Sequence, residues 1–141
     1  MGVDTSVELC GVRLRNPLVL ASGIWGSCAE TLVRVARAGA GAVTAKSCSL
    51  RPRAGHPNPT VLAWGGGLIN AVGLSNPGAA AQRDTLRAAK NGLVPLNTPL
   101  IASVFGDSRK QFAEAARIIS EAEPDFIELN ISCPNVEHEF G

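Results

Sequence analysis

The segment from Glu128 to Asn135 holds the residues best suited to chemistry, because a cysteine stands there among asparagines and a serine. An apolar run from Phe126 to Ile131 predicts a buried strand that ends just before Cys133. In parallel α/β folds, active sites lie at the carboxyl ends of the strands. A free thiol has a pKa of about 8.5, so Cys133 is a candidate base near neutral pH. Nucleophilic catalysis would need a histidine partner, and the nearby His138 is interpreted as solvated or as part of a mobile lid.

Polar or small residues also follow the other predicted strands. Three strands are expected before this one: residues 18–21 followed by Ser22 and Gly23, residues 41–45 followed by Lys46 and Ser47, and residues 100–104 with Ser103. The ends of parallel strands meet at one face, so these side chains should surround one pocket together with Asn130, Ser132 and Cys133. Lys46 could hold a carboxylate there or bond an electron-rich cofactor ring. The alternative is an ordinary surface lysine.

Helical periodicity between these strands sets the expected fold. Helices are predicted over residues 29–38, over residues 78–90 with Asn91 and Gly92 as the end signal, and after an N-cap at Asp107 or Ser108. A hairpin is predicted over residues 7–14. Continuous apolar strands alternating with helices indicate a parallel sheet with helices outside it. We therefore expect residues 1–141 to form the first half of one TIM (β/α)8 barrel, with four strands and an amino-terminal hairpin. A complete open sheet of four strands is the alternative.

A long segment rich in proline and glycine covers residues 48–77. Its apolar residues, among them Trp64, Leu68 and Ile69, favour an ordered and functional loop. Asn70 follows three glycines, which would allow a close approach of the backbone to a ligand. A mobile glycine hinge with an Asx turn is equally open. The glycine run is not a phosphate-binding fingerprint, because it does not lie between a strand and a helix at the required spacing.

Composition narrows the function classes. The chain of 141 residues is 45% hydrophobic with a net charge of +1, which gives no electrostatic argument for nucleic acid or a membrane surface. No apolar run is long enough to span a bilayer, and no secretory signal is expected at the start. The four cysteines form no C-x-x-C pair, so no metal site is expected, and Cys10, Cys28 and Cys48 should be buried or half-buried thiols. Free thiols indicate a reducing, cytoplasmic location.

Several of these motifs occur together in one known family. They are residues 16–23, Lys46 and Ser47, residues 57–60, residues 67–78 and residues 130–135. In this order the chain resembles the amino-terminal half of class 1 dihydroorotate dehydrogenase, a flavin enzyme of pyrimidine (UMP) biosynthesis. The resemblance implies a β/α barrel with FMN at the carboxyl face of the strands. It also implies oxidation of (S)-dihydroorotate to orotate, in which Cys133 removes the C5 proton while a hydride passes from C6 to N5 of FMN.

The resemblance also implies individual roles. Asn70, Asn130 and Asn135 would bond the substrate ring, and Lys46 would lie between the substrate carboxylate and the flavin. The backbone of Ala71, Val72, Gly73 and Leu74 would line the substrate. Residues expected to contact FMN are Ala21, Ser22, Gly23, Lys46, Ser47, Ser103 and Asn130. Ser103 replaces the asparagine that is usual in the family at the end of the third strand.

The sequence of residues 70–74 is more similar to that of the NAD-linked subtype B than to that of the fumarate-linked enzymes. That subtype works with a partner subunit that carries FAD and a [2Fe–2S] cluster, and a homodimer or heterotetramer is expected. Because the family's flavin phosphate site lies in later strands, we expect this fragment to bind FMN poorly and to be nearly inactive. We also expect it to expose an aggregation-prone apolar edge on the fourth strand and on the helices.

Two alternatives stay open. One is a pyrimidine reductase similar to dihydropyrimidine dehydrogenase, which usually has a histidine where Asn135 stands. The other is a non-catalytic half-barrel that binds a phosphate or a sugar.

Overall fold

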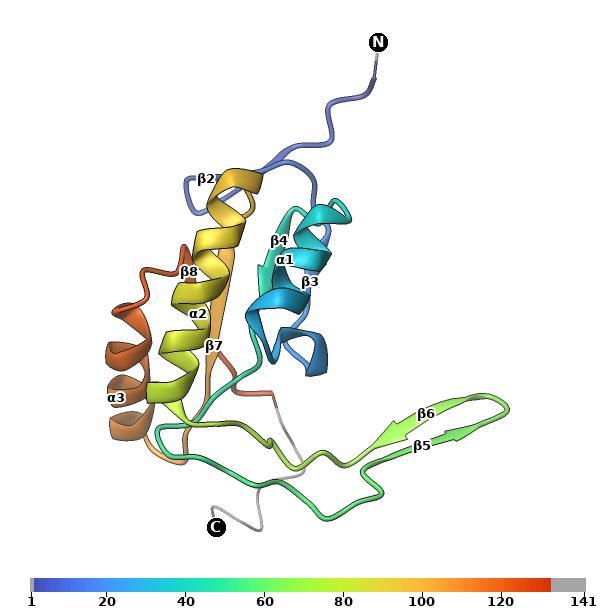
Figure 1. Cartoon of the computed structure of the whole chain (residues 1–141), viewed down its shortest axis with the longest axis vertical. Coiled ribbons are helices and arrows are strands. Elements are labelled where there is room, and N and C mark those ends of the chain that lie inside the picture. Colours follow the sequence, from blue (N-terminus) through green and yellow to red (C-terminus); the bar gives the residue numbers. More distant parts are fainter. Residues whose placement is uncertain (1, 133–141) are drawn as a thin grey trace.

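A computed structural model, which describes residues 2–132, has a four-stranded parallel sheet with three helices packed on one face (Figure 1). The sheet order is β3-β4-β7-β8, and the strands are β3 (Val19–Leu20), β4 (Ala42–Thr44), β7 (Leu100–Val104) and β8 (Phe126–Leu129). The helices are α1 (Ala29–Arg37), α2 (Ala79–Leu93) and α3 (Arg109–Ser120). The predicted alternation of parallel strands and helices is confirmed. Residues 2–132 form no closed barrel, so the half-barrel remains a prediction.

The main core lies between the helices and the sheet. Leu32 of α1, Leu86 and Leu93 of α2 and Ile119 of α3 are fully buried against it. In α2 the buried residues recur every three or four positions, which gives the helix one apolar face. The strands contribute alternate residues to the same core, among them Val43, Ala45, Leu100, Ala102 and Val104.

The opposite face of the sheet is covered at its amino end by the predicted hairpin. β1 (Val7–Leu9) pairs with β2 (Val12–Leu14), and Leu14 packs on Ala42, Ile101 and Phe126. The hairpin covers the first residues of the strands, so the carboxyl ends lie away from it. Cys10 is exposed, contrary to expectation, because it forms the two-residue turn with Gly11, and both have positive φ, at 47° and 80°.

α2 ends later than the sequence indicated. The expected end near Lys90 relied on Gly92 as a stop signal, but α2 continues to Leu93 and into the 3₁₀ turn η2 (Val94–Leu96). A Cβ on Gly92 would lie 2.5 Å from Cγ2 of Val33, so this glycine allows α1 and α2 to pack closely. The left-handed residue is Asn97, with φ of 48°.

Residues 48–77 are ordered, as expected, but they contain two strands that we did not predict. β5 (Val61–Trp64) and β6 (Gly67–Asn70) form an antiparallel hairpin across Gly65 and Gly66. The glycine run therefore makes a turn of the kind that favours hairpins. The hairpin projects from the body of the molecule (Figure 1).

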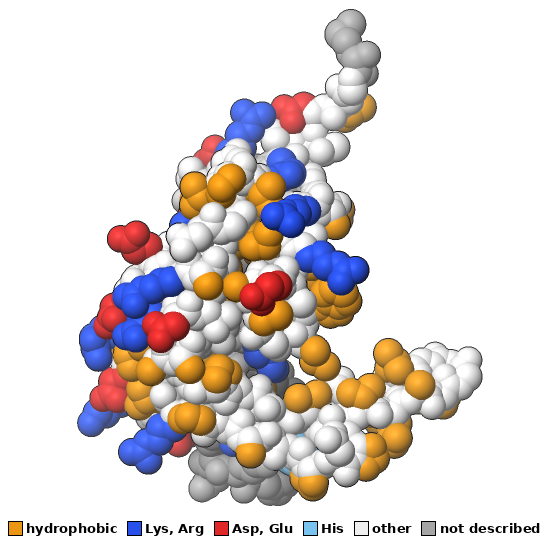
Figure 2. Space-filling view, in the orientation of Figure 1, with side chains coloured by type: hydrophobic (Ala, Val, Ile, Leu, Met, Phe, Trp, Pro, Cys, Tyr) orange, Lys and Arg blue, Asp and Glu red, His pale blue; other side chains and the backbone are white. Residues whose placement is uncertain are grey.

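The hairpin surface contrasts with the helical surface. Every residue of β5 and β6 is exposed, including Trp64 at 59% and Leu68 at 71%, and no Asp, Glu, Lys or Arg occurs between Arg53 and Arg83. Figure 2 shows apolar side chains along this arm, whereas charged side chains gather over the helices. An isolated two-stranded hairpin is marginally stable in water, so its conformation depends on how the loop is fastened at its base.

The apolar edge expected on the fourth strand is present. Ile127 and Leu129 of β8 are 39% and 57% exposed. Among the described residues, no large apolar side chain of α1, α2 or α3 is similarly exposed, so the expectation for the helices is wrong. Within residues 2–132, no helix is both long and apolar enough to cross a membrane.

Candidate active site

Three serines and an asparagine meet at the carboxyl ends of the four parallel strands. Ser47, just beyond β4, lies at the centre, with its Oγ 2.9 Å from Oγ of Ser22 and 2.8 Å from Oγ of Ser103. It also accepts a hydrogen bond of 3.1 Å from Nδ2 of Asn130. We call these four residues the serine cluster. The structure thus brings together polar groups that the sequence assigned separately to four strand ends.

Burial makes the serine cluster rigid. Ser47 and Ser103 are each 2% exposed, and Ser22 and Asn130 are half-buried. The backbone N–H of Ser47 donates to Oγ of Ser22 at 2.9 Å, which ties the loop after β3 to the loop after β4. Hydroxyls buried with partners in this way avoid the cost of an unsatisfied polar group.

Glu128 extends the cluster, and the sequence reasoning missed it. Oγ of Ser103 donates to Oε1 of Glu128 at 2.6 Å. Ser103 and Glu128 are cross-strand partners in the parallel pairing of β7 with β8. Strand alternation could have placed Glu128 on the same face as Phe126 and Asn130, but the contact with Ser103 also depends on the register of the strands. A carboxylate therefore lies beside the hydroxyls.

The asparagine that follows β8 is held on both sides. The backbone N–H of Asn130 donates to the carbonyl of Val104 at 2.8 Å, which continues the strand pairing. Its Oδ1 accepts from N and from Oγ of Ser132, each at 3.2 Å. The chain therefore leaves the sheet toward residue 133 along a fixed path. Cys133, Asn135 and His138 lie outside the described residues.

Lys46 is positioned by a close contact of backbone with backbone. The 3₁₀ turn η1 (Ile24–Gly26) packs against the end of β4, and the N–H of Lys46 donates to the carbonyl of Gly26 at 2.9 Å. A Cβ on Gly26 would lie 2.5 Å from N of Lys46 and 2.7 Å from O of Thr44. Only glycine fits at position 26. The loop after β3, which includes Ala21 and Gly23, therefore holds the backbone of the half-buried Lys46 in place.

The predicted substrate segment, residues 70–74, is fastened to its own loop. Asn70 is the last residue of β6 and is exposed. The hydrogen bonds next to it join Ala71 N to Thr60 O at 2.8 Å, His56 N to Val72 O at 3.2 Å and Arg53 Nε to Gly73 O at 2.8 Å. Gly73 and Leu74 both have positive φ. No hydrogen bond of the described part joins this segment to the serine cluster, so its contact with a substrate stays a prediction.

Asn76 fastens the base of the loop, and it is the second residue that sequence reasoning missed. It is 7% exposed, and its Oδ1 accepts from N of Ser49 at 3.1 Å and from N of Gly78 at 2.9 Å. Its Nδ2 donates to O of Leu74 at 2.8 Å, and its backbone forms two bonds of 2.9 Å with Arg53. Every bonding group of this side chain is used.

We expect Asn76→Ala to loosen residues 48–77. The substitution leaves the buried N–H groups of Ser49 and Gly78 without acceptors, which should cost roughly 3 kcal/mol of unfolding free energy. Limited proteolysis should then cut this loop faster, and urea unfolding should report the lost stability. Asn91→Ala, at an exposed position of α2, is the matched control. Equal proteolysis of both variants would contradict the anchoring role.

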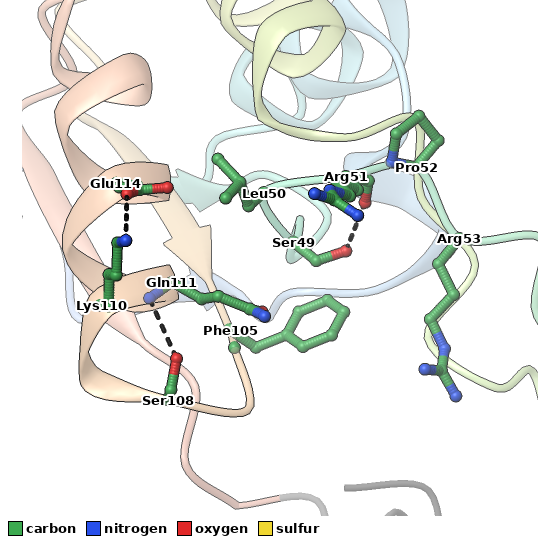
Figure 3. Close-up of a pocket in the computed structure, with 11 residues that line it drawn as sticks. Ser49, Leu50, Arg51, Pro52, Arg53, Phe105, Ser108, Lys110, Gln111 and Glu114 are labelled. Atoms are coloured by element: carbon green, nitrogen blue, oxygen red, sulfur yellow. Dashed lines mark hydrogen bonds and ion pairs between the residues drawn. The ribbon is translucent and has the colours of Figure 1, made fainter.

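A hollow of about 480 Å³ lies between the start of α3 and residues 49–53 (Figure 3). Phe105 and Gln111 line it, and Lys110 is paired with Glu114 at 4.0 Å. Ser108 caps α3 here by accepting from N of Gln111 at 3.3 Å, as the sequence predicted. None of the serine cluster lines this hollow.

Cys48 can be excluded as the reactive thiol. It is completely buried, and desolvation raises its pKa to about 12. A thiol with that pKa is almost entirely protonated near neutral pH and is a poor base. Residues 2–132 hold no group of three His, Cys, Asp or Glu side chains that could bind a metal ion.

Comparison with known proteins identifies the family. The family sequence model described as dihydroorotate dehydrogenase matches residues 5–140. The catalytic subunit of dihydroorotate dehydrogenase B (NAD(+)) from Methanothermobacter thermautotrophicus is 51% identical over 133 residues, which are 94% of this chain and 41% of the relative. The subunits of the same name from Methanocaldococcus jannaschii and Geobacter metallireducens are 43% and 40% identical, over 92% and 96% of this chain and 42% and 44% of their own lengths.

The chain thus spans about two-fifths of the length of these curated relatives. The match runs through all four strand ends that form the serine cluster and through the segment after β8. The resemblance inferred from the motifs is confirmed: the chain belongs to the dihydroorotate dehydrogenase family.

Proposed function

We propose that the full-length protein oxidises dihydroorotate to orotate with FMN as the hydride acceptor. The observation that carries this proposal is the serine cluster, because it gathers hydroxyls and an amide at the carboxyl ends of four parallel strands, directly before Cys133. Flavin sites of β/α folds occupy this edge. This chain spans about two-fifths of the length of its relatives, so the activity of the whole protein is a proposal.

The residues at this edge suit a flavin ring. Ala21, Ser22, Gly23 and Ser47 are small, which leaves room for a flat ring above the strand ends. Ser103 and Asn130 add polar groups, and Lys46 brings a cation to the same edge. When bound, FMN would supply the two-electron chemistry by taking the hydride from C6 of the substrate. Because the hydroxyl of Ser103 is already bonded to Ser47 and Glu128, we expect its contribution to FMN to be indirect.

The chain's own residues would bind the substrate and move one proton. Cys133, as a thiolate, would take the proton from C5, so the substrate loses a proton to sulfur and a hydride to the cofactor. Lys46 would bind the substrate carboxylate as a compact positive charge. Asn70, Asn130 and Asn135 would bond the ring, and the backbone of residues 71–74 would enclose it. Five of these nine residues, Asn70 and residues 71–74, come from the loop that Asn76 fastens.

The half-barrel, the partner and the location belong to the same proposal. We propose that β3, β4, β7 and β8 are the first four strands of a TIM barrel. The relatives are named catalytic subunits of an NAD(+)-linked enzyme, which supports a partner subunit. We propose that this partner carries FAD and a [2Fe–2S] cluster, as the resemblance of the motifs implies. The proposed assembly is a homodimer or a heterotetramer. The free thiols of Cys10, Cys28 and Cys48 favour the cytoplasm.

The test uses the full-length protein with two substrates. We expect it to purify with bound FMN, and dihydroorotate should bleach the flavin under anaerobic conditions as orotate appears. Dihydrouracil, which lacks the carboxylate, should bleach it far more slowly, because Lys46 has no charge to bind. A protein without FMN, or one that prefers dihydrouracil, would contradict the proposal.

A further inference from the structure

The carboxylate of Glu128 stands at one end of a continuous chain of hydrogen bonds. The chain runs from Glu128 through Ser103 to Ser47 and there branches to Ser22 and Asn130, over distances of 2.6 to 3.1 Å. Two of its hydroxyls are almost fully buried, so water does not compete for them. Nothing in the proposed reaction uses Glu128 directly.

The carboxylate determines which atom donates at each step. A carboxylate only accepts, so the single hydroxyl proton of Ser103 points at Glu128. Ser103 can then only accept from Ser47, whose proton is in turn used. Ser47 must accept from its other neighbours, and it does accept from Nδ2 of Asn130. The charge therefore acts through two hydroxyls on the amide of Asn130, which lies two residues beyond Glu128 on the same face.

The amide of Asn130 has two possible orientations, and this chain of bonds favours the same one as the backbone N–H of Ser132. With Nδ2 toward Ser47, Oδ1 faces Ser132 and accepts its two hydrogen bonds. One N–H of the Asn130 amide donates to Ser47. The other N–H can donate to a carbonyl of a ligand. In the flipped orientation Oδ1 of Asn130 would replace the N–H that faces the ligand, and it would repel a carbonyl of the ligand.

We propose that Glu128 is a positioning residue, which acts through Ser103 and Ser47 to hold the Asn130 amide with an N–H toward the ligand. The proposal rests on the proposed function only in naming that ligand as the substrate or product ring. Glu128→Gln keeps the size of the side chain but can donate to Ser103. The hydroxyl protons can then reverse, so the amide keeps only the bonds from Ser132 to hold its orientation.

A double-mutant cycle in the full-length protein tests the pathway. Orotate binding, followed by the change in flavin absorbance, should weaken about tenfold for Glu128→Gln and about tenfold for Ser103→Ala, because a hydrogen bond to a charged group is lost in each. The double variant should also be weakened about tenfold, since both changes break one chain. A hundredfold loss would mean that Glu128 acts independently, and no loss in Glu128→Gln would mean that it has no role. Both results would overturn the proposal.

A second measurement needs neither cofactor nor substrate. The side-chain amide protons of Asn130 should give two well-separated NMR signals in the parent protein, and Glu128→Gln should shift them. The amide signals of the exposed Asn91 should not move. Glu123→Gln, on the turn at the opposite end of β8, is the matched control and should leave both residues unchanged.

This measurement separates the two proposals. Unchanged Asn130 signals in Glu128→Gln would overturn the positioning role, even in a protein that oxidises dihydroorotate. Shifted signals in a protein without flavin or dehydrogenase activity would support the positioning role and reject the proposed function. Because Glu128 is exposed, its substitution should not prevent folding.

Discussion

Cys133→Ala in the full-length protein should lower the rate of dihydroorotate oxidation by roughly 10²–10⁴-fold near neutral pH, the usual contribution of a general base. Without the thiolate, no side chain of the described site replaces it, because Cys48 is buried with a pKa of about 12 and Glu128 is bonded to Ser103. FMN should stay bound, since Cys133 is not among the groups assigned to it and most of those groups lie on the other strand ends. The measurements are kcat, from orotate formation, and the flavin content of the purified variant.

The pH dependence gives this prediction its control. Cys133→Ser keeps a proton acceptor of much higher pKa, so its residual rate should rise with pH beyond the range in which the parent enzyme has levelled off. Cys10→Ala removes an exposed thiol at the turn between β1 and β2 and should leave the rate unchanged. A Cys133→Ala enzyme with the parent's rate would show that the base is another group.

The sequence predicted the strand ends well because two independent signals coincide there. An apolar run ends, and a small or polar residue begins, at Ser22, at Lys46 and Ser47, at Ser103 and at Asn130. Because the carboxyl ends of parallel strands meet at one edge of the sheet, no further sequence signal is needed to predict that these residues lie together. The structure confirms this convergence in the hydrogen bonds around Ser47.

Pairwise contacts across strands could not be derived in the same way. The contact of Ser103 with Glu128 depends on the register of β7 and β8, and a shift by one residue would turn Glu128 to the other face. Glu128 reads in sequence as one charged residue in an apolar strand. Its role becomes visible only when the register is known.

Glycine and asparagine were the most ambiguous residues. The sequence left open whether Gly65 and Gly66 allow close approach to a ligand or form a mobile hinge, whereas they form a hairpin turn. Gly92 was expected to end α2, but it gives room to Val33. Asn76 lies next to proline and glycine and resembles any turn residue, whereas its burial and four side-chain bonds hold the loop. These residues permit many conformations, so only three-dimensional contacts determine which of them is used.

Gly26→Ala should have the largest effect on stability among the substitutions considered, because its new Cβ meets backbone atoms that cannot move aside separately. It would lie 2.5 Å from N of Lys46, 2.7 Å from O of Thr44 and 2.8 Å from C of Ala45. Overpacking a tight site commonly costs 1–3 kcal/mol, and contact with backbone rather than with a flexible side chain places this change at about 3 kcal/mol or more. Urea unfolding of the full-length protein measures the loss.

The same substitution should also weaken the active site, since η1 can make room only by moving away from the start of Lys46. The hydrogen bond from N of Lys46 to O of Gly26 would lengthen, and the backbone of Lys46 would no longer be held in place at the end of β4. We therefore expect weaker orotate binding in the fraction that folds. Gly65→Ala is the matched control, because a Cβ there has no atom within 4 Å, and its effect should stay within about 0.5 kcal/mol. If Gly26→Ala were as stable as Gly65→Ala, the contact of η1 with β4 could not be what positions Lys46.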